Sequence, residues 1–174
     1  MFDPKIHHRR SIRLRDFDYS NSGAYFITID CEKMRHRFGE VINGKMVLND
    51  LGIIAFNEWI NLNIRFTNMT NEIFQIMPNH MHGIILLDLD LKECSGSKLK
   101  LSEIIGAYKS IVSNKCLKVF KAKNELMSQL WKRNYFEHVI RNEISHFKIA
   151  DYIMQNPANW NKYKDDLIDL TTFY

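Results

Sequence analysis

Residues 72–87 read EIFQIMPNHMHGIILL, and this stretch decides how the rest of the chain can be arranged. Its first part, Glu72–Met77, is rich in residues that favour strands and predicts one. Pro78 and Asn79 stop that strand, and His82–Leu87 predicts a buried strand that leaves the turn. A pair of strands joined by a short turn is therefore expected in the middle of the chain.

Three elements are predicted before this pair. Tyr25–Cys31 alternates apolar and polar residues and is expected to form a half-buried strand. Phe38–Leu48 is expected to form a hairpin, because an Asn-Gly pair at residues 43–44 separates two strand-like runs and favours a type I′ turn. A helix is predicted to begin at Asn49 or Asp50, either of which can cap its first turn.

Three more elements are predicted after the pair. Ser102 can cap a second helix. One face of that helix carries apolar residues at helical spacing, namely Ile104, Ile105, Tyr108, Val112 and Cys116. Tyr135–Arg141 predicts another strand. Asn142 can cap a third helix, which is expected to end near Asn156 because Pro157 disfavours helical geometry at the residue before it.

The order of these elements indicates the fold class. Without the hairpin and the last helix, the order is β-α-β-β-α-β, which is the ferredoxin-like arrangement. The sequence therefore predicts an α+β protein, a ferredoxin-like sandwich with an extra N-terminal hairpin and a C-terminal helix. At 174 residues, the chain is expected to form a single domain over residues 1–174, in which residues 1–15 are a basic arm.

The positive charge of the chain is concentrated in two blocks. The formal net charge is +4. Residues 1–15 carry 5 basic residues and 1 acidic residue, residues 98–148 carry 11 basic and 4 acidic, and the intervening residues 16–97 carry 6 basic and 11 acidic. Such asymmetry indicates contact with nucleic acid, although scattered solvated lysines would give the same totals.

Several classes of protein are disfavoured by what the sequence lacks. The cysteines, Cys31, Cys94 and Cys116, are far apart and form no CxxC pair, which argues against a disulfide framework and against a cysteine zinc site. No apolar run is long enough to span a membrane, and residues 1–15 lack the apolar core of a signal peptide. A cytoplasmic protein in a reducing environment is therefore expected.

Two histidines follow the Pro-Asn turn. His80 and His82 are two residues apart, so on a strand they point to the same face, while Met81 points to the other. Two imidazoles that converge in this way make half of a metal site. The competing interpretation is that both are ordinary polar residues at a strand end near a turn.

The third predicted helix and the strand before it add three candidates. Tyr152 and Asn156 are four residues apart and share a helix face, where they could supply a nucleophile and a metal ligand. The same pattern also fits an ordinary amphipathic helix. His138 lies on the apolar face of the predicted strand, where it could be a third ligand, a phosphate contact or a core histidine.

Basic and aromatic residues cluster in the second basic block. Lys109 and Lys115 are the centre of a basic helix face that could hold a phosphate backbone. Trp131, Lys132 and Arg133 place an aromatic ring beside cations, a combination that suits stacking on unpaired bases. A solvated lysine-rich helix would have the same composition.

Five blocks of the sequence resemble, in order and spacing, the single-tyrosine HUH transposases, and especially the REP-associated tyrosine transposases. The blocks are RRSIRL with the following DY and YFIT, then FGEVINGKMVLND, MPNHMHGII, IIGAYKS, and WKRNYFEHVIRNE with the following DYIMQNPANW. Together they span nearly the whole chain. The resemblance implies a ferredoxin-like fold, which agrees with the order of elements above.

The resemblance also implies roles for individual residues. His80 and His82 match the two histidines of the HUH motif, with Met81 as its hydrophobic residue, and would ligate a divalent cation, Mg²⁺ or Mn²⁺. Tyr152 matches the catalytic tyrosine. Asn156 falls where relatives carry a helical amide that completes the metal site, although many relatives outside the REP-associated branch carry glutamine.

In an enzyme of this family, Tyr152 would attack the scissile phosphate in line and give a 5′-phosphotyrosine and a free 3′-OH. The substrate is expected to be single-stranded DNA, often carrying a hairpin. Lys109, Arg133 and Arg141 are expected to contact its backbone, and His138 is a further expected phosphate contact. The strand would run along the three basic residues towards the tyrosine.

Two other functions stay open. The first is a non-catalytic nucleic-acid-binding module, because RNA-recognition domains share the ferredoxin-like sheet and a fold does not determine function. The second is a metal-dependent hydrolase in which the histidine pair works with water and Tyr152 is structural. The hairpin at Phe38–Leu48, or the tail at Thr171–Tyr174, could also be the surface of a homodimer.

Overall fold

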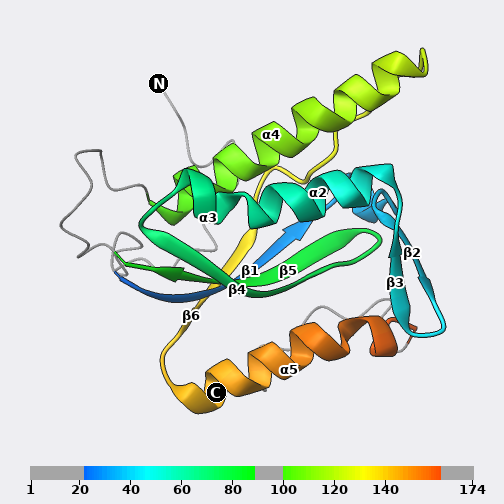
Figure 1. The fold of residues 1–174 in the computed structure, drawn as a ribbon. Coiled ribbons are helices and arrows are strands. Elements are labelled where there is room, and N and C mark those ends of the chain that lie inside the picture. Colours follow the sequence, from blue (N-terminus) through cyan, green and yellow to red (C-terminus); the bar gives the residue numbers. More distant parts are fainter. Residues whose placement is uncertain (1–21, 89–99, 162–174) are drawn as a thin grey trace, which may run out of the picture.

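A four-stranded antiparallel sheet runs through the middle of the molecule (Figure 1). Its strands are β1 (Gly23–Asp30), β4 (Met69–Ile76), β5 (His80–Leu87) and β6 (Phe136–Ile140), in the spatial order β4-β5-β1-β6. The first and third strands of a β-α-β-β-α-β series thus lie side by side at the centre, as in a ferredoxin-like fold. The predicted α+β class is confirmed.

The computed structural model describes residues 22–88 and 100–161. The predicted basic arm at residues 1–15, Cys94 and the tail at residues 171–174 lie outside these ranges. No helix within them is both long enough and apolar enough to cross a membrane.

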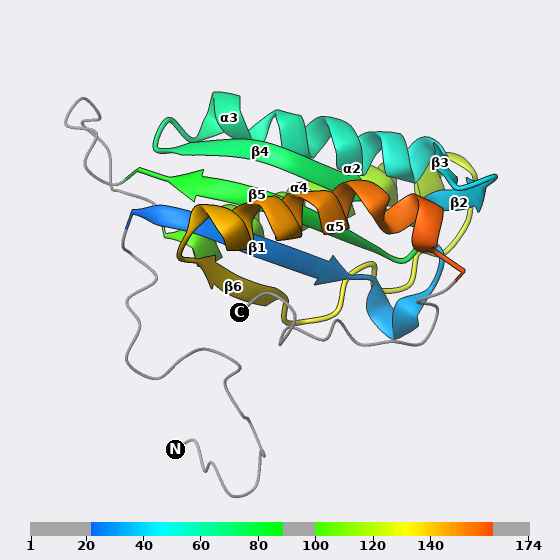
Figure 2. The ribbon, with the colours of Figure 1, turned by 90° about the horizontal axis from the view of Figure 1, so that it is seen from below.

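Helices cover both faces of the sheet. On one face lie α2 (Asp50–Ile60), the short α3 (Leu62–Arg65) and α4 (Leu101–Ala122), whereas α5 (Glu143–Asn159) lies across the other face (Figures 1 and 2). Because successive side chains of a strand alternate between faces, each face has its own apolar core. The larger core, between the sheet and the helices α2 and α4, is buried around Trp59 and Tyr108, whose rings meet edge to face.

The predicted hairpin forms a separate two-stranded sheet. Its strands β2 (Gly39–Ile42) and β3 (Lys45–Leu48) pair antiparallel. The turn residues Asn43 and Gly44 have φ values of 49° and 72°, as the predicted type I′ turn requires. The hairpin is inserted between β1 and α2, as the order of the sequence elements predicts. Its turn reaches α5, since a Cβ atom on Gly44 would lie 3.4 Å from the Cα atom of Ala158.

The helix caps agree with the sequence at two of three positions. Asn49 Oδ1 accepts hydrogen bonds from the first turn of α2, and Asn142 Oδ1 accepts one from the first turn of α5. The predicted cap at Ser102 is wrong. The N-cap of α4 is Lys100, whose backbone N–H donates to the carboxylate of Glu103 at 2.8 Å. The acidic side chain at the third helical position therefore sets the start of α4.

The predicted end of the last helix is also wrong. Helix α5 continues through Pro157 to Asn159 instead of stopping near Asn156. A proline inside a helix removes one backbone donor, which leaves the carbonyl of Ile153 without its usual partner. Both Ile153 and Pro157 are buried in the structure, and the packing of this helix on the sheet outweighs the local preference.

Candidate active site

The two histidines of the sequence motif lie at the start of β5, on the face of the sheet that α5 covers. The ring centroids of His80 and His82 are 4.4 Å apart. Opposite them on β1, Asp30 pairs in register with His80, and Thr28 pairs with His82. The alternation of the strand explains this arrangement, because Met81 between the histidines is fully buried in the core on the other face.

Each histidine is oriented through its Nδ1 atom. Nδ1 of His82 lies 2.8 Å from Oγ1 of Thr28, and Nδ1 of His80 lies 2.7 Å from Oδ1 of Asn79. An amide oxygen only accepts hydrogen bonds, so the proton of His80 sits on Nδ1 and its Nε2 atom keeps a free lone pair. That Nε2 atom is buried and has no hydrogen-bond partner among the described residues.

Both imidazoles are neutral at physiological pH. Burial lowers the pKa of His80 to about 4, although the carboxylate of Asp30 opposes this shift and the ammonium group of Lys132 adds to it. Burial also lowers the pKa of His82 well below its usual value, with a further contribution from His80. Neutral imidazoles are the form in which histidine binds a metal ion.

Tyr152 reaches the histidines from α5. Its hydroxyl oxygen lies 3.3 Å from Nε2 of His82, and its ring packs edge to face on Phe26 of β1 at a centroid distance of 6.3 Å. Asn156, one helical turn further along α5, is 7% exposed. The tertiary structure thus brings the hydroxyl of Tyr152 to a histidine that is 70 positions away in the chain.

The donor set fits a divalent cation. No group of three or more His, Cys, Asp or Glu side chains in residues 22–88 and 100–161 could hold a metal ion, so the candidate ligands are the two histidines and an amide. The free Nε2 atom of His80, beside a second neutral imidazole, is the structural feature that favours a cation here. Asn156 lies on the adjoining helix and is buried, and its role as an oxygen ligand stays a prediction.

Three polar residues of the site, Thr28, Asn79 and Asp30, are not among the candidates predicted from the sequence, whereas Lys132 is predicted there only as part of a base-stacking cluster. Thr28 and Asn79 orient the histidines. Asp30 and Lys132 form an ion pair at 2.8 Å beside His80. Thr28 and Asp30 occupy the polar positions of the first strand, so strand alternation could have identified their face, but not their partners.

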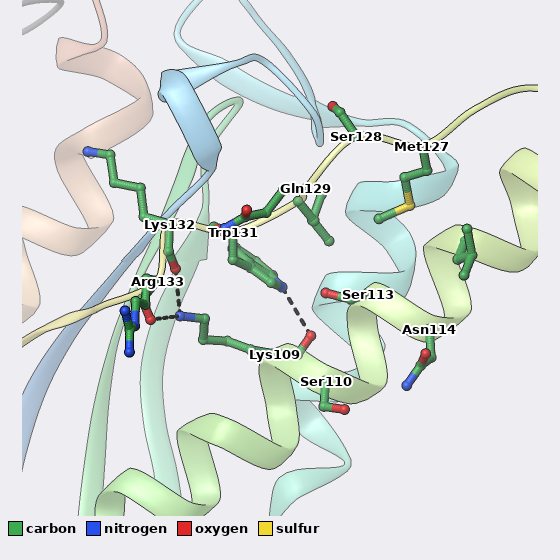
Figure 3. Close-up of a pocket in the computed structure, with 12 residues that line it drawn as sticks. Lys109, Ser110, Ser113, Asn114, Met127, Ser128, Gln129, Trp131, Lys132 and Arg133 are labelled. Carbon is green, nitrogen blue, oxygen red and sulfur yellow. Dashed lines mark hydrogen bonds between the residues drawn. The ribbon is translucent and has the colours of Figure 1, made fainter. Parts of the chain in front are cut away.

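The predicted DNA contacts Lys109 and Arg133 lie near each other, at a cavity of about 450 Å³ between α4 and residues 127–133 (Figure 3). The Nζ atom of Lys109 donates to the backbone carbonyl oxygens of Lys132 and Arg133, at 2.7 and 2.9 Å. This ammonium group therefore holds the segment against α4, and burial lowers its pKa. A phosphate contact of Lys109 or Arg133 stays a prediction.

The other two predicted DNA contacts lie on and after β6. His138 pairs in register with Phe26 and is half-buried, and burial lowers its pKa, with Arg141 adding to the shift. Arg141 follows Ile140, which pairs with Ala24, four residues before Thr28 on β1. Arg141 is one residue further, so at roughly 3.3 Å per strand residue it lies on the order of 16 Å from the level of His82 along the sheet. Phosphate contacts of His138 and Arg141, and a DNA path along the basic residues to Tyr152, stay predictions.

Comparison with known proteins relates this fold to a family. Residues 45–156 match the family model of IS200-like transposases. A protein of Haemophilus influenzae that bears no assigned function is 38% identical over 175 residues, which cover 92% of this chain and 94% of that protein. The solved structure of a REP-associated tyrosine transposase bound to a REP hairpin matches with a TM-score of 0.62 at 19% identity, covering 89% of this chain and 77% of that chain.

Proposed function

The chain belongs to the IS200-like transposase family, and from this membership we propose that it cleaves and rejoins single-stranded DNA with Tyr152 as the nucleophile. The observation that carries the proposal is the contact between the hydroxyl of Tyr152 and Nε2 of His82, next to a second neutral histidine. This contact places a tyrosine hydroxyl directly beside the candidate cation site, where it could attack a phosphate held there.

In the proposed reaction, the phenolic oxygen of Tyr152 forms a bond to the scissile phosphorus. The bond from phosphorus to the 3′-oxygen breaks, so a 5′-phosphotyrosine remains on the protein and the 3′-oxygen takes up a proton. The ordinary pKa of tyrosine is near 10, so its proton must be accepted. Nε2 of His82 can accept a hydrogen bond from that hydroxyl only while its lone pair is free, so with a cation on Nε2 the proton of Tyr152 would leave to solvent.

We propose that the Nε2 atoms of His80 and His82, with the amide oxygen of Asn156, hold a divalent cation, Mg²⁺ or Mn²⁺. When bound, the cation would act as a Lewis acid on an oxygen of the scissile phosphate. The hydrogen bonds to Asn79 and Thr28 hold both rings by Nδ1 and leave Nε2 as the atom that would bind the cation. The neutrality of both imidazoles means that no proton has to leave before the ion binds.

The proposed substrate is a single strand that carries a hairpin. The structural neighbour was solved with a REP hairpin, and residues 98–148 of this chain carry 11 basic and 4 acidic residues. An attack in line with the scissile bond has easier access to an unpaired strand than to a duplex. Binding should weaken steeply as salt rises, because neutralised phosphates release their counterions.

Incubation with labelled DNA tests the function. With Mn²⁺, a hairpin with single-stranded flanks should give a covalent protein–DNA adduct and a shortened strand, whereas the same sequence fully paired should give neither. Denaturing gel electrophoresis separates the products. Cleavage without an adduct would favour a hydrolase instead, and binding without cleavage would favour a binding module.

Removing the acceptor behind His82 should weaken the cation site. Thr28→Val keeps the shape of the side chain but leaves Nδ1 of a buried histidine without its partner. We expect about 10- to 100-fold weaker Mn²⁺ binding in isothermal titration calorimetry, as is usual when the partner of a ligating histidine is lost. Thr70→Val, an exposed threonine on β4, is the matched control and should leave the affinity unchanged. Equal affinities of the two variants would contradict the role of Thr28.

A further inference from the structure

A row of flat rings leads from the candidate active site to the surface. It starts at Tyr152 and continues through His82 and His80, at centroid distances of 5.2 and 4.4 Å. The next ring is Trp160, which caps the C-terminal end of α5 and lies 5.9 Å from His80 at an interplanar angle of 34°. The last is the exposed His36, 5.7 Å from Trp160.

Two arginines without an ion pair among the described residues flank the last ring, His36, in the chain. They belong to the β1–β2 loop, which is defined here as residues 31–38 and includes His36. The guanidinium groups of Arg35 and Arg37 both donate to Oγ of Ser128. No carboxylate of the described residues forms an ion pair with either group. Guanidinium groups without an acidic partner favour phosphate.

The β1–β2 loop is held in one shape. Its 3₁₀ turn η1 (Glu32–Met34) contains two non-glycine residues with positive φ, 56° at Lys33 and 50° at Met34. The loop is anchored at both ends, because the N–H of Glu32 donates to the carbonyl of Leu130, and its last two residues donate to the carbonyl of Pro78. Such strained backbone persists where the surroundings over-determine it, and it is concentrated at ligand sites.

We propose that Trp160 and His36 are a stacking platform for an unpaired base next to the scissile phosphate, and that Arg35 and Arg37 hold phosphates of the same strand. This inference rests on the proposed cleavage of single-stranded DNA and adds a subsite to it. Proteins that bind single-stranded nucleic acid without reading its sequence combine aromatic rings, which stack on the bases, with cations that contact the phosphates. The rings of Trp160 and His36 and the cations of the β1–β2 loop are such a combination. Figure 2 shows the C-terminal end of α5 and the turn after β1 at the same end of the sheet.

Tryptophan fluorescence can report on this platform. The chain has three tryptophans, of which Trp59 and Trp131 are 0% and 4% exposed, whereas Trp160 is partly exposed. The experiment uses the full chain carrying Tyr152→Phe, without added cation, so that no cleavage occurs. The probe is a hairpin oligodeoxynucleotide with single-stranded flanks, compared with the same hairpin without flanks. The flanked hairpin should quench the Trp160 emission, and the blunt hairpin should not.

Substitutions at residue 160 separate stacking from packing. Trp160→Leu, which keeps apolar bulk without a ring, should bind the flanked hairpin on the order of tenfold more weakly, within the range for one lost base stack. Trp160→Phe should keep most of the affinity and lose the fluorescence change. Phe147→Leu is the matched control, an aromatic residue on the same helix that is 70% exposed and outside the row of rings, and its affinity should not change.

The two proposals can fail separately. If Trp160→Leu binds the flanked hairpin as tightly as its parent, or if saturating DNA leaves Trp160 unquenched, the stacking platform is overturned even when wild-type protein forms the covalent adduct. If DNA quenches Trp160 and Trp160→Leu weakens binding, the platform stands even when wild-type protein forms no adduct. In that second case only the proposed cleavage chemistry fails.

Discussion

Tyr152→Phe is expected to abolish the covalent DNA adduct and to lower strand cleavage by more than about a thousandfold, the scale on which removal of a nucleophile acts. The substitution removes only the hydroxyl, which lies 3.3 Å from Nε2 of His82. The ring keeps its edge-to-face packing on Phe26, so the fold is not expected to change. Denaturing gels of labelled flanked hairpin with Mn²⁺ measure both the adduct and the shortened strand.

Tyr108→Phe is the matched control for this result. Its hydroxyl donates to the backbone carbonyl of Ala55 and lies in the core on the opposite face of the sheet. Loss of that hydroxyl should cost some stability but leave the adduct at the wild-type level. If Tyr152→Phe still formed the adduct in full, the assignment of the nucleophile would be wrong. If it cleaved DNA as the wild type does while neither formed an adduct, a hydrolase would be favoured.

The second large effect concerns stability and a buried carboxylate. The side chain of Glu58 on α2 is 1% exposed and pairs with two cations, Arg65 of α3 at 2.6 Å and Lys115 of α4 at 2.5 Å. Replacing both cations with methionine, which keeps an apolar stem, should destabilise the protein by about 3–5 kcal/mol at pH 7, because it leaves a buried charge without a partner. Urea unfolding followed by circular dichroism measures this difference.

Restoring neutrality is the control for this prediction. Adding Glu58→Gln to the double methionine variant removes the unpaired charge, and should recover part of the lost stability. Equal stability of the double and triple variants would show that lost packing, and not the buried charge, causes the effect. A double variant that lost less than about 1 kcal/mol would contradict the prediction itself.

The same triad predicts how the wild type responds to acid. Burial opposes ionisation of Glu58, but the hydrogen bonds from Lys115 and Arg65 outweigh it, so its pKa is lower than the usual 4.5. A carboxyl whose pKa is lowered on folding stabilises the native state above its unfolded pKa. That contribution should therefore be complete at pH 7 and be lost as the pH falls below 4.5 through the folded value. The Glu58→Gln protein should lack this component of the acid transition.

The sequence by itself determined the elements and the faces they present. Some features depend only on neighbours a few residues away, so the local sequence predicts them. They are the Asn-Gly turn, the caps at Asn49 and Asn142, and the apolar face of α4. Strand alternation also places His80 and His82 on one face, whichever element covers that face.

Only the tertiary structure decided what those faces meet. Thr28 lies 54 positions from His82, and Tyr152 lies 70 positions from it, so no local pattern encodes either contact. Packing on the sheet likewise lets α5 continue past Pro157, although the local preference of proline predicted that the helix ends near Asn156. It also turned the ammonium group of Lys109 onto backbone carbonyls, although the sequence showed only a basic helix face. Periodicity determines which side chains share a surface, whereas the partners of that surface depend on how distant segments pack together.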